Sequence, residues 1–177
     1  MTQGRTLSIN RAPVLTLWAA VVAERLGFDY ETALTLGRAV AGLNAYAKGV
    51  SLGRFEPSSK AVDEHLEKAK AGTTLKVDLP HRAVPVVRTP EGLRALSKDR
   101  PISSTSVERY LQGKFGEELR AVRRAMEKLA RSLPPQELAL RAYHFYEVFR
   151  PEIPAGVRGW GAAGELDPDR IEALAEQ

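Results

Sequence analysis

The first fifty residues constrain the fold most, because they contain two helix-length segments that are apolar on nearly every side. The first runs from about Ala12 to Leu26, and the second from about Tyr30 to Lys48. A helix without a polar face is normally buried. Gly27 favours an end to the first helix, and Asp29 is a good cap for the second. We therefore expect a buried helical hairpin that forms the core or part of a homodimer interface.

Small residues in the second segment predict close packing between helices. Gly37, Ala41 and Gly42 carry little or no side chain. Such positions let the backbone of a neighbouring helix approach closely.

The hairpin also has the spacing of a DNA-reading helix-turn-helix, with Ala23 and Gly27 four residues apart. Its second helix, however, begins with Asp29 and Glu31, whose carboxylates are repelled by a phosphate backbone. The residues that follow are too apolar to face a DNA groove. We therefore interpret the hairpin as a structural element.

The apolar run from Pro13 to Ala23 has the length of the apolar part of a secretory signal peptide, and it is too short to span a bilayer. The run continues into the second apolar helix, which a cleaved leader would not do. We expect the segment to be retained in a cytoplasmic protein that has no membrane partner.

Downstream of the hairpin the hydrophobic period changes several times. A polar amphipathic helix is predicted over residues 58–71, and a β-hairpin over residues 75–87, where Pro85 places the second strand at an edge. Cap and proline signals then predict helices over residues 90–96, 117–132 and 136–149. They also predict a helix that Thr105 caps and that ends near Gly113 or Gly116, and a last helix over residues 169–175 that Asp167 caps. The predicted fold is mainly α, or α+β at the margin, with about seven helices and one short β-hairpin in the middle of the chain.

The loop from Lys98 to Ser104 is the predicted boundary between two halves. Residues 1–97 hold the apolar hairpin, the surface helix and the β-hairpin, and residues 104–177 hold the remaining helices. A chain of 177 residues is the size of one domain. We expect one compact domain or two small halves packed closely together.

Composition narrows the function class. With 44% hydrophobic and 27% charged residues, the chain has an ordinary globular composition. The absence of cysteine excludes a disulfide framework, thiolate zinc ligation and a cysteine nucleophile. The low content of asparagine and methionine and the excess of arginine over lysine favour a heat-adapted source, although a bias toward GC-rich codons gives the same arginine excess. The net charge of +4 is compatible with a polyanionic partner.

The sequence gives little support to an enzymatic function. His65, His81 and His144 are far apart, and His144 lies in an aromatic stretch that indicates a place in the core. No nucleophile elbow or phosphate-binding Gly-Lys-Ser/Thr motif occurs. We predict no catalytic residue, metal or cofactor, so an enzyme ranks third among the function classes.

Residues 159–164 spell the G-x-G-x-x-G pattern of dinucleotide-binding folds. In those folds the glycines open a helix inside a unit of about 30 residues that returns to a second strand. We expect no second strand after Gly164 and interpret the run as a flexible loop before a last short helix. A dinucleotide is therefore not a predicted partner.

The segment from Glu117 to Ser132 carries the strongest functional pattern. Apolar residues at helical spacing face the core: Leu119, Val122, Met126, Leu129 and Leu133. The cations that fall on a different stripe are Arg120, Arg124, Lys128 and Arg131. Glu127 is spaced to pair with Arg123 and Arg131. A row of cations one turn apart can meet successive phosphates.

Arg158 and Trp160 lie in the glycine-rich run and can stack on a base or grip a partner protein. Alternatively, Trp160 fills the space beside the helix around Tyr143 to Phe149. The favoured function is a non-enzymatic accessory protein that binds DNA or RNA through the basic helix face. The alternative is a helical protein-interaction subunit or homodimer.

Overall fold

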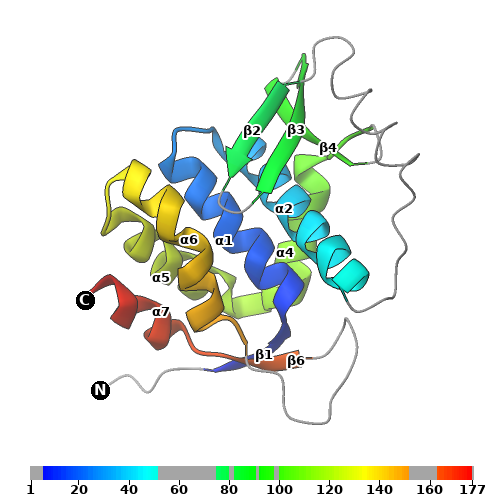
Figure 1. The fold of residues 1–177 in the computed structure, drawn as a ribbon. Coiled ribbons are helices and arrows are strands. Elements are labelled where there is room, and N and C mark those ends of the chain that lie inside the picture. Colours follow the sequence, from blue (N-terminus) through cyan, green and yellow to red (C-terminus); the bar gives the residue numbers. More distant parts are fainter. Residues whose placement is uncertain are drawn as a thin grey trace.

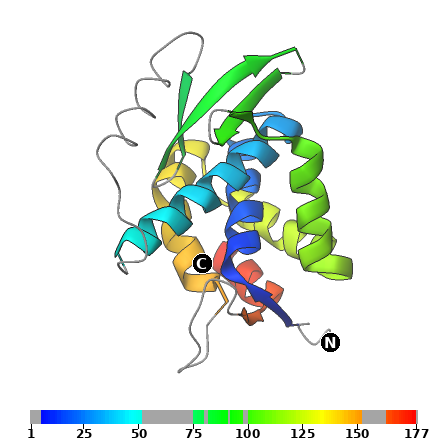
Figure 2. The same ribbon diagram turned by 90° about the vertical axis from the view of Figure 1, so that its right-hand side faces the viewer.

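The computed structural model describes residues 6–51, 75–79, 82–90, 92–97, 100–151 and 163–176 (Figure 1). The helices of this part are α1 (Arg11–Arg25), α2 (Tyr30–Ser51), α4 (Ser104–Phe115), α5 (Leu119–Arg131), α6 (Pro135–Phe149) and α7 (Pro168–Ala175), with a 3-10 turn η1 (Gly116–Glu118) before α5. The strands are β1 (Leu7–Asn10), β2 (Leu75–Leu79), β3 (Arg82–Thr89), β4 (Gly92–Ser97), β5 (Arg100–Pro101) and β6 (Ala163–Leu166). The described part is mainly helical, with small antiparallel sheets at opposite ends of the helical body (Figures 1 and 2).

Helix α1 lies at the centre of the helical body and packs against α2, α4, α5 and α6 (Figure 2). Every residue from Pro13 to Ala23 is buried. The Trp18 indole N–H donates to the Ala142 carbonyl oxygen of α6 at 2.8 Å, and the Trp18 ring meets the Phe149 ring edge-on with centroids 5.4 Å apart. The predicted burial of the first apolar helix is confirmed, because the chain itself surrounds it.

The turn between α1 and α2 has the predicted glycine. Gly27 adopts a φ of 114°, and the Phe28 N–H donates to the Ala23 carbonyl at 3.1 Å, which is how a helix is commonly ended. The predicted close approach is confirmed at Gly37, where an added Cβ would meet the carbonyl oxygen of Thr16. An added Cβ at Gly42 would meet nothing within 4 Å, so the tight contact is local to Gly37.

The predicted β-hairpin is present but extends into a four-stranded meander, in the order β2-β3-β4-β5. The helix predicted over residues 90–96 is wrong, since Gly92–Ser97 is strand β4. Thr89 pairs with Gly92 in a tight reversal, where Gly92 takes a φ of 127° and the Thr89 hydroxyl donates to its carbonyl at 2.7 Å. The segment predicted to start a helix thus joins two antiparallel strands.

The edge position predicted for β3 from Pro85 is also wrong, because β3 lies between β2 and β4. The ladder between β3 and β4 runs from the pair Thr89 and Gly92 to the pair Val86 and Ala95, and so it stops one residue short of Pro85. Pro85 itself therefore lies just past the end of the ladder with β4, although it still has a register partner, Lys76, on β2. An inner strand tolerates this proline because no ladder hydrogen bond to β4 needs an N–H donor at that position.

Strand β6 contradicts the expectation that no strand forms after Gly164. Residues Ala163 to Leu166 pair antiparallel with β1, with Ile9 opposite Gly164. Ile9 and Leu166 are buried in the core. Tertiary packing therefore makes a strand of four residues that show no alternating pattern.

Two helix starts compare differently with their predicted caps. Helix α4 begins earlier than predicted, because Ser103, and not Thr105, is its cap and accepts from the Ser106 N–H at 3.3 Å. Helix α7 is capped by Asp167 as predicted. The described residues hold fewer helices than the seven or so predicted for the chain, because one predicted helix is β4. The helix predicted over residues 58–71 lies outside the described residues.

The two halves proposed from the sequence share their packing in the described part. One core cluster contains residues from α1 and α2 together with residues from α4, α5, α6 and α7. Strand β5 lies inside the predicted boundary loop and pairs with β4.

Candidate nucleic-acid interface

Helix α5 divides sharply into an apolar face and a charged face. Val122, Met126 and Leu129 have no exposed surface, and Leu119 and Leu133 are half-buried against the core, as predicted. The opposite face carries four exposed cations one or two turns apart, which we call the basic crest: Arg120, Arg124, Lys128 and Arg131. The apolar face therefore fixes the direction in which the crest points.

Residues of the apolar hairpin hold α5 in place. The Arg25 guanidinium of α1 donates to the carbonyl oxygens of Ala130 at 3.4 Å and Leu133 at 3.1 Å, at the C-terminal end of α5. Arg123 places its Nη2 atom 2.8 Å from both carboxylate oxygens of Glu24. The Arg25 bonds satisfy one carbonyl that the end of α5 leaves unpaired and another just beyond that end. Together with the pair of Arg123 and Glu24 they fix one flank of α5, and we call these contacts the anchor.

Arg123 belongs to this anchor and not to the crest. Its guanidinium lies 5.0 Å from the centroid of the Tyr30 ring, and the Tyr30 hydroxyl donates to the Glu108 carboxylate at 3.1 Å. Partial burial and this hydrogen bond raise the pKa of Tyr30, so its phenol stays neutral and remains a donor at neutral pH. The anchor thus joins α1, α2, α4 and α5.

The four crest cations differ in their carboxylate partners. Arg131 lies 3.6 Å from Glu127, a predicted pair, and Lys128 lies 3.4 Å from Glu176 of α7. Within the described part of the chain, Arg120 and Arg124 have no carboxylate within 4.0 Å. The crest therefore presents two uncompensated guanidinium groups one helical turn apart.

Two surface hollows lie along α5. One, near its start, is lined by Gln112, Gly116, Glu117, Leu119, Arg120 and Arg123. The other, near its end, is lined by Arg124, Glu127, Lys128, Arg131, Ser132 and Ala175. Each hollow includes at least one crest cation, so the crest is bordered by concave surface as well as by open helix.

The other two predicted site residues, Arg158 and Trp160, lie outside the described residues. The same holds for His65 and His81, for which the sequence predicts no catalytic or metal role. His144 is exposed on α6, so its predicted place in an aromatic core is wrong: the buried face of α6 holds Phe145, Tyr146 and Phe149 instead. Among the described residues, no group of three or more possible metal ligands gathers.

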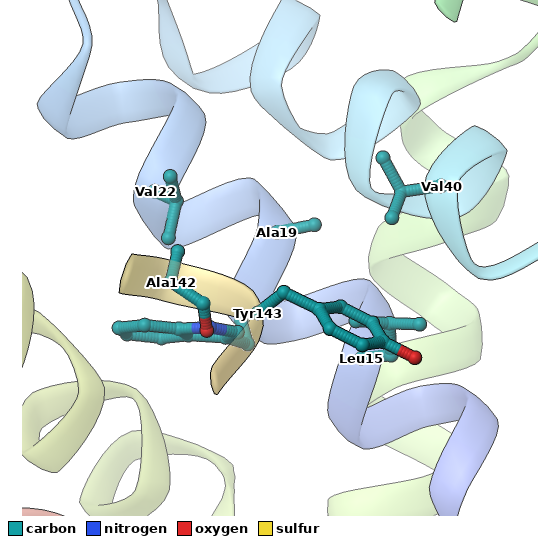
Figure 3. Close-up of a pocket in the computed structure, with 7 residues that line it drawn as sticks. Leu15, Ala19, Val22, Val40, Ala142 and Tyr143 are labelled. Carbon is teal, nitrogen blue, oxygen red and sulfur yellow. The ribbon is translucent and has the colours of Figure 1, made fainter. Parts of the chain in front are cut away.

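A small apolar crevice lies between α1, α2 and α6 (Figure 3). It is lined by Leu15, Trp18, Ala19, Val22, Val40, Ala142 and Tyr143. Its accessible volume of about 10 Å³ holds no more than about one water molecule, far below the few hundred cubic ångströms of a small-molecule site. The crevice is therefore a packing defect in the core wall.

Comparison with known proteins adds no functional assignment. No protein-family model matches the sequence, and neither the curated proteins nor the solved structures include a significant match. In the described part of the chain, no helix has the length and apolar character that a membrane crossing requires.

Proposed function

We propose that the protein is a non-enzymatic accessory protein that binds DNA or RNA through the basic crest of α5. The observation that carries this proposal is the pair of exposed guanidinium groups at Arg120 and Arg124, which have no carboxylate partner among the described residues. Charged side chains without partners on a rigid helix are well suited to phosphate, since a bidentate guanidinium matches phosphate oxygens.

The spacing of the crest fits a nucleic-acid backbone. From Arg120 to Arg131 the helix rises about 16 Å, at ~1.5 Å per residue. Successive phosphates on one strand of a duplex advance about 3.4 Å along the axis, so the crest covers about five steps. Contacts to phosphate fix position without reading bases, and we therefore propose binding with little sequence preference.

A salt titration tests the proposal. We expect the parent protein to bind a labelled duplex or single strand of about 20 nucleotides near 50 mM salt and to weaken steeply as salt rises. Replacing Arg120, Arg124 and Lys128 together by glutamine should flatten the plot of log K against log salt by about 2–3 units, at ~0.9 per lost phosphate contact. The melting temperature should hardly change, because exposed charges contribute little to stability.

The control removes the same charge elsewhere. Arg100, Lys114 and Arg141 are exposed and lie on β5, α4 and α6. The variant with these three residues changed to glutamine should keep most of the salt slope of the parent. Equal slopes for the two triple variants would attribute binding to net charge and reject the crest, and a parent that does not bind near 50 mM salt would reject the function.

The alternative remains a protein-interaction subunit or homodimer. The apolar surface of the N-terminal hairpin favours such an interface in the sequence, but in the structure the chain itself covers α1. The observation that favours the alternative is now Leu140 of α6, whose surface is 87% exposed. A single exposed leucine is a weaker signal than an apolar patch, so the crest leads.

A further inference from the structure

The hollow at the end of the crest combines cations and carboxylates in an unusual arrangement. Arg124, Lys128 and Arg131 line it from α5, and Ala175 of α7 forms part of its wall. Helix α7 packs along α5 and brings the Glu176 carboxylate 3.4 Å from the Lys128 ammonium. An acidic group of the chain thus sits where an external anion would meet Lys128.

The two carboxylates around the hollow are engaged to different degrees. Glu127 lies 3.6 Å from both Arg123 and Arg131, so it belongs to the anchor as well as to the crest. The Glu176 side chain is 70% exposed, and it pairs with Lys128, which is itself 51% exposed. An exposed pair of this kind is held weakly, so an incoming phosphate can displace Glu176 at small cost.

We infer that this hollow seats a backbone phosphate of the bound nucleic acid between Arg124 and Lys128, and that Glu176 competes with that phosphate for Lys128. The inference rests on the proposed function and names the part of the crest that holds the ligand most closely. Arg124 supplies a guanidinium that pairs with no carboxylate of the described residues, while Glu176 must leave Lys128 before that cation binds. Glu176, at the end of α7, therefore lowers the affinity of this hollow for the phosphate.

The size of the effect follows from the strength of an exposed ion pair. Removing the competitor should tighten binding about two- to fivefold at low salt, the equilibrium factor of a pair worth up to ~1 kcal/mol. The gain should shrink as ionic strength rises, because salt screens exposed pairs. A general gain in positive charge would instead act from any position on the surface.

The test compares two glutamate substitutions that change the net charge equally. Glu176→Gln removes the competitor, while Glu137→Gln removes an exposed carboxylate that pairs with Arg141 on α6 at 3.3 Å. With a labelled duplex of about 20 base pairs near 50 mM salt, Glu176→Gln should tighten binding two- to fivefold over Glu137→Gln. In a Lys128→Gln background, Glu176→Gln should give no more than the Glu137→Gln effect.

The outcomes separate the two proposals. If the parent binds with a steep salt slope but Glu176→Gln equals Glu137→Gln, the competition is rejected and the nucleic-acid function stands. If the parent does not bind, both are rejected. A parallel titration with inorganic phosphate distinguishes a free anion from a backbone: saturation by phosphate as tight as by the duplex would reject a nucleic acid as the ligand of the hollow.

Discussion

Helices α1 and α5 lie against each other but use their side chains in opposite ways. Helix α1 is buried on all sides along most of its length, with Leu17 at 0% exposure and Trp18 at 2%. Helix α5 buries one face equally well and exposes a row of cations on the other. Helix α1 thus buries its side chains inside the protein on every side, whereas α5 keeps one face exposed, where a partner can bind.

This contrast indicates which residues are worth testing for binding. A residue of α1 such as Val14 has no exposed surface, so it cannot touch a partner while the protein is folded. On α5, in contrast, Arg120 and Arg124 are exposed and have no carboxylate partner among the described residues. No such ion pair therefore gives them a role in the stability of the fold. Exposed charges that do little for the fold are the residues to test for binding.

The largest expected effect concerns the scaffold. Leu17→Ala should lower the free energy of unfolding by about 2–5 kcal/mol, because it leaves a cavity at a site with no exposed surface. Urea denaturation measures this loss. Leu140→Ala on α6 is the control, since that side chain is 87% exposed and its loss should change stability by about 0.5 kcal/mol or less. Equal stability of the two variants would remove α1 from the core.

The second prediction divides α5 within two neighbouring residues. Arg123→Gln breaks the contacts with Glu24 and Tyr30 and should cost about 1–2 kcal/mol of stability. Arg124→Gln should change stability by no more than about 0.5 kcal/mol. In binding the order should reverse, with Arg124→Gln lowering the salt slope by about 0.9 and Arg123→Gln leaving it nearly unchanged. Loss of slope in both variants would dissolve the distinction between anchor and crest.

The smallest effect tests a charge that serves the hairpin. Asp29 caps α2 and accepts from the Thr32 hydroxyl at 2.6 Å, and this side-chain hydrogen bond lowers the pKa of Asp29 below 3.8. Asp29→Ala should cost about 1 kcal/mol at neutral pH. Because the folded pKa is depressed, the stabilisation is present above pH 3.8 and is lost as the pH falls through the folded value.

Unfolding by urea at neutral pH and near pH 3 measures that dependence. The stability difference between the parent and Asp29→Ala should shrink at the lower pH. Asp29→Asn keeps a capping oxygen but does not titrate, so it should lose less stability and show a smaller change with pH. A constant difference between the parent and Asp29→Ala would mean that the carboxylate charge does not matter to the cap.

The fold could be predicted where a signal is local. The apolar hairpin, the turn at Gly27 and the two faces of α5 follow from spacing along the chain and are found in the structure. The sequence predicts a helix where β4 lies, because a threonine followed by proline and glutamate is typical of a helix start as well as of a turn between strands. The pairing of β4 with β3 decides between these two structures. Strand β6 depends on β1, more than 150 residues away, and no local pattern reports it.

The candidate site divides in the same way. Its cations and the pair of Arg131 with Glu127 follow from helical spacing. The pair of Lys128 with Glu176 joins residues 48 apart in the sequence, and the pair of Arg123 with Glu24 joins residues 99 apart. Sequence spacing therefore identified which side chains are cationic, and tertiary packing determined which of them have a carboxylate partner.

The central position of α1 has a consequence for how the protein is made. The hydrogen bond from Trp18 to Ala142 spans 124 residues, so the face of α1 that packs on α6 has no partner until most of the chain has been synthesised, although α2 follows α1 directly. At about 5–20 residues per second, that face waits roughly 6–25 seconds for its cover. A buried apolar face of the finished protein is thus open to chaperones, and to aggregation, while the chain is growing.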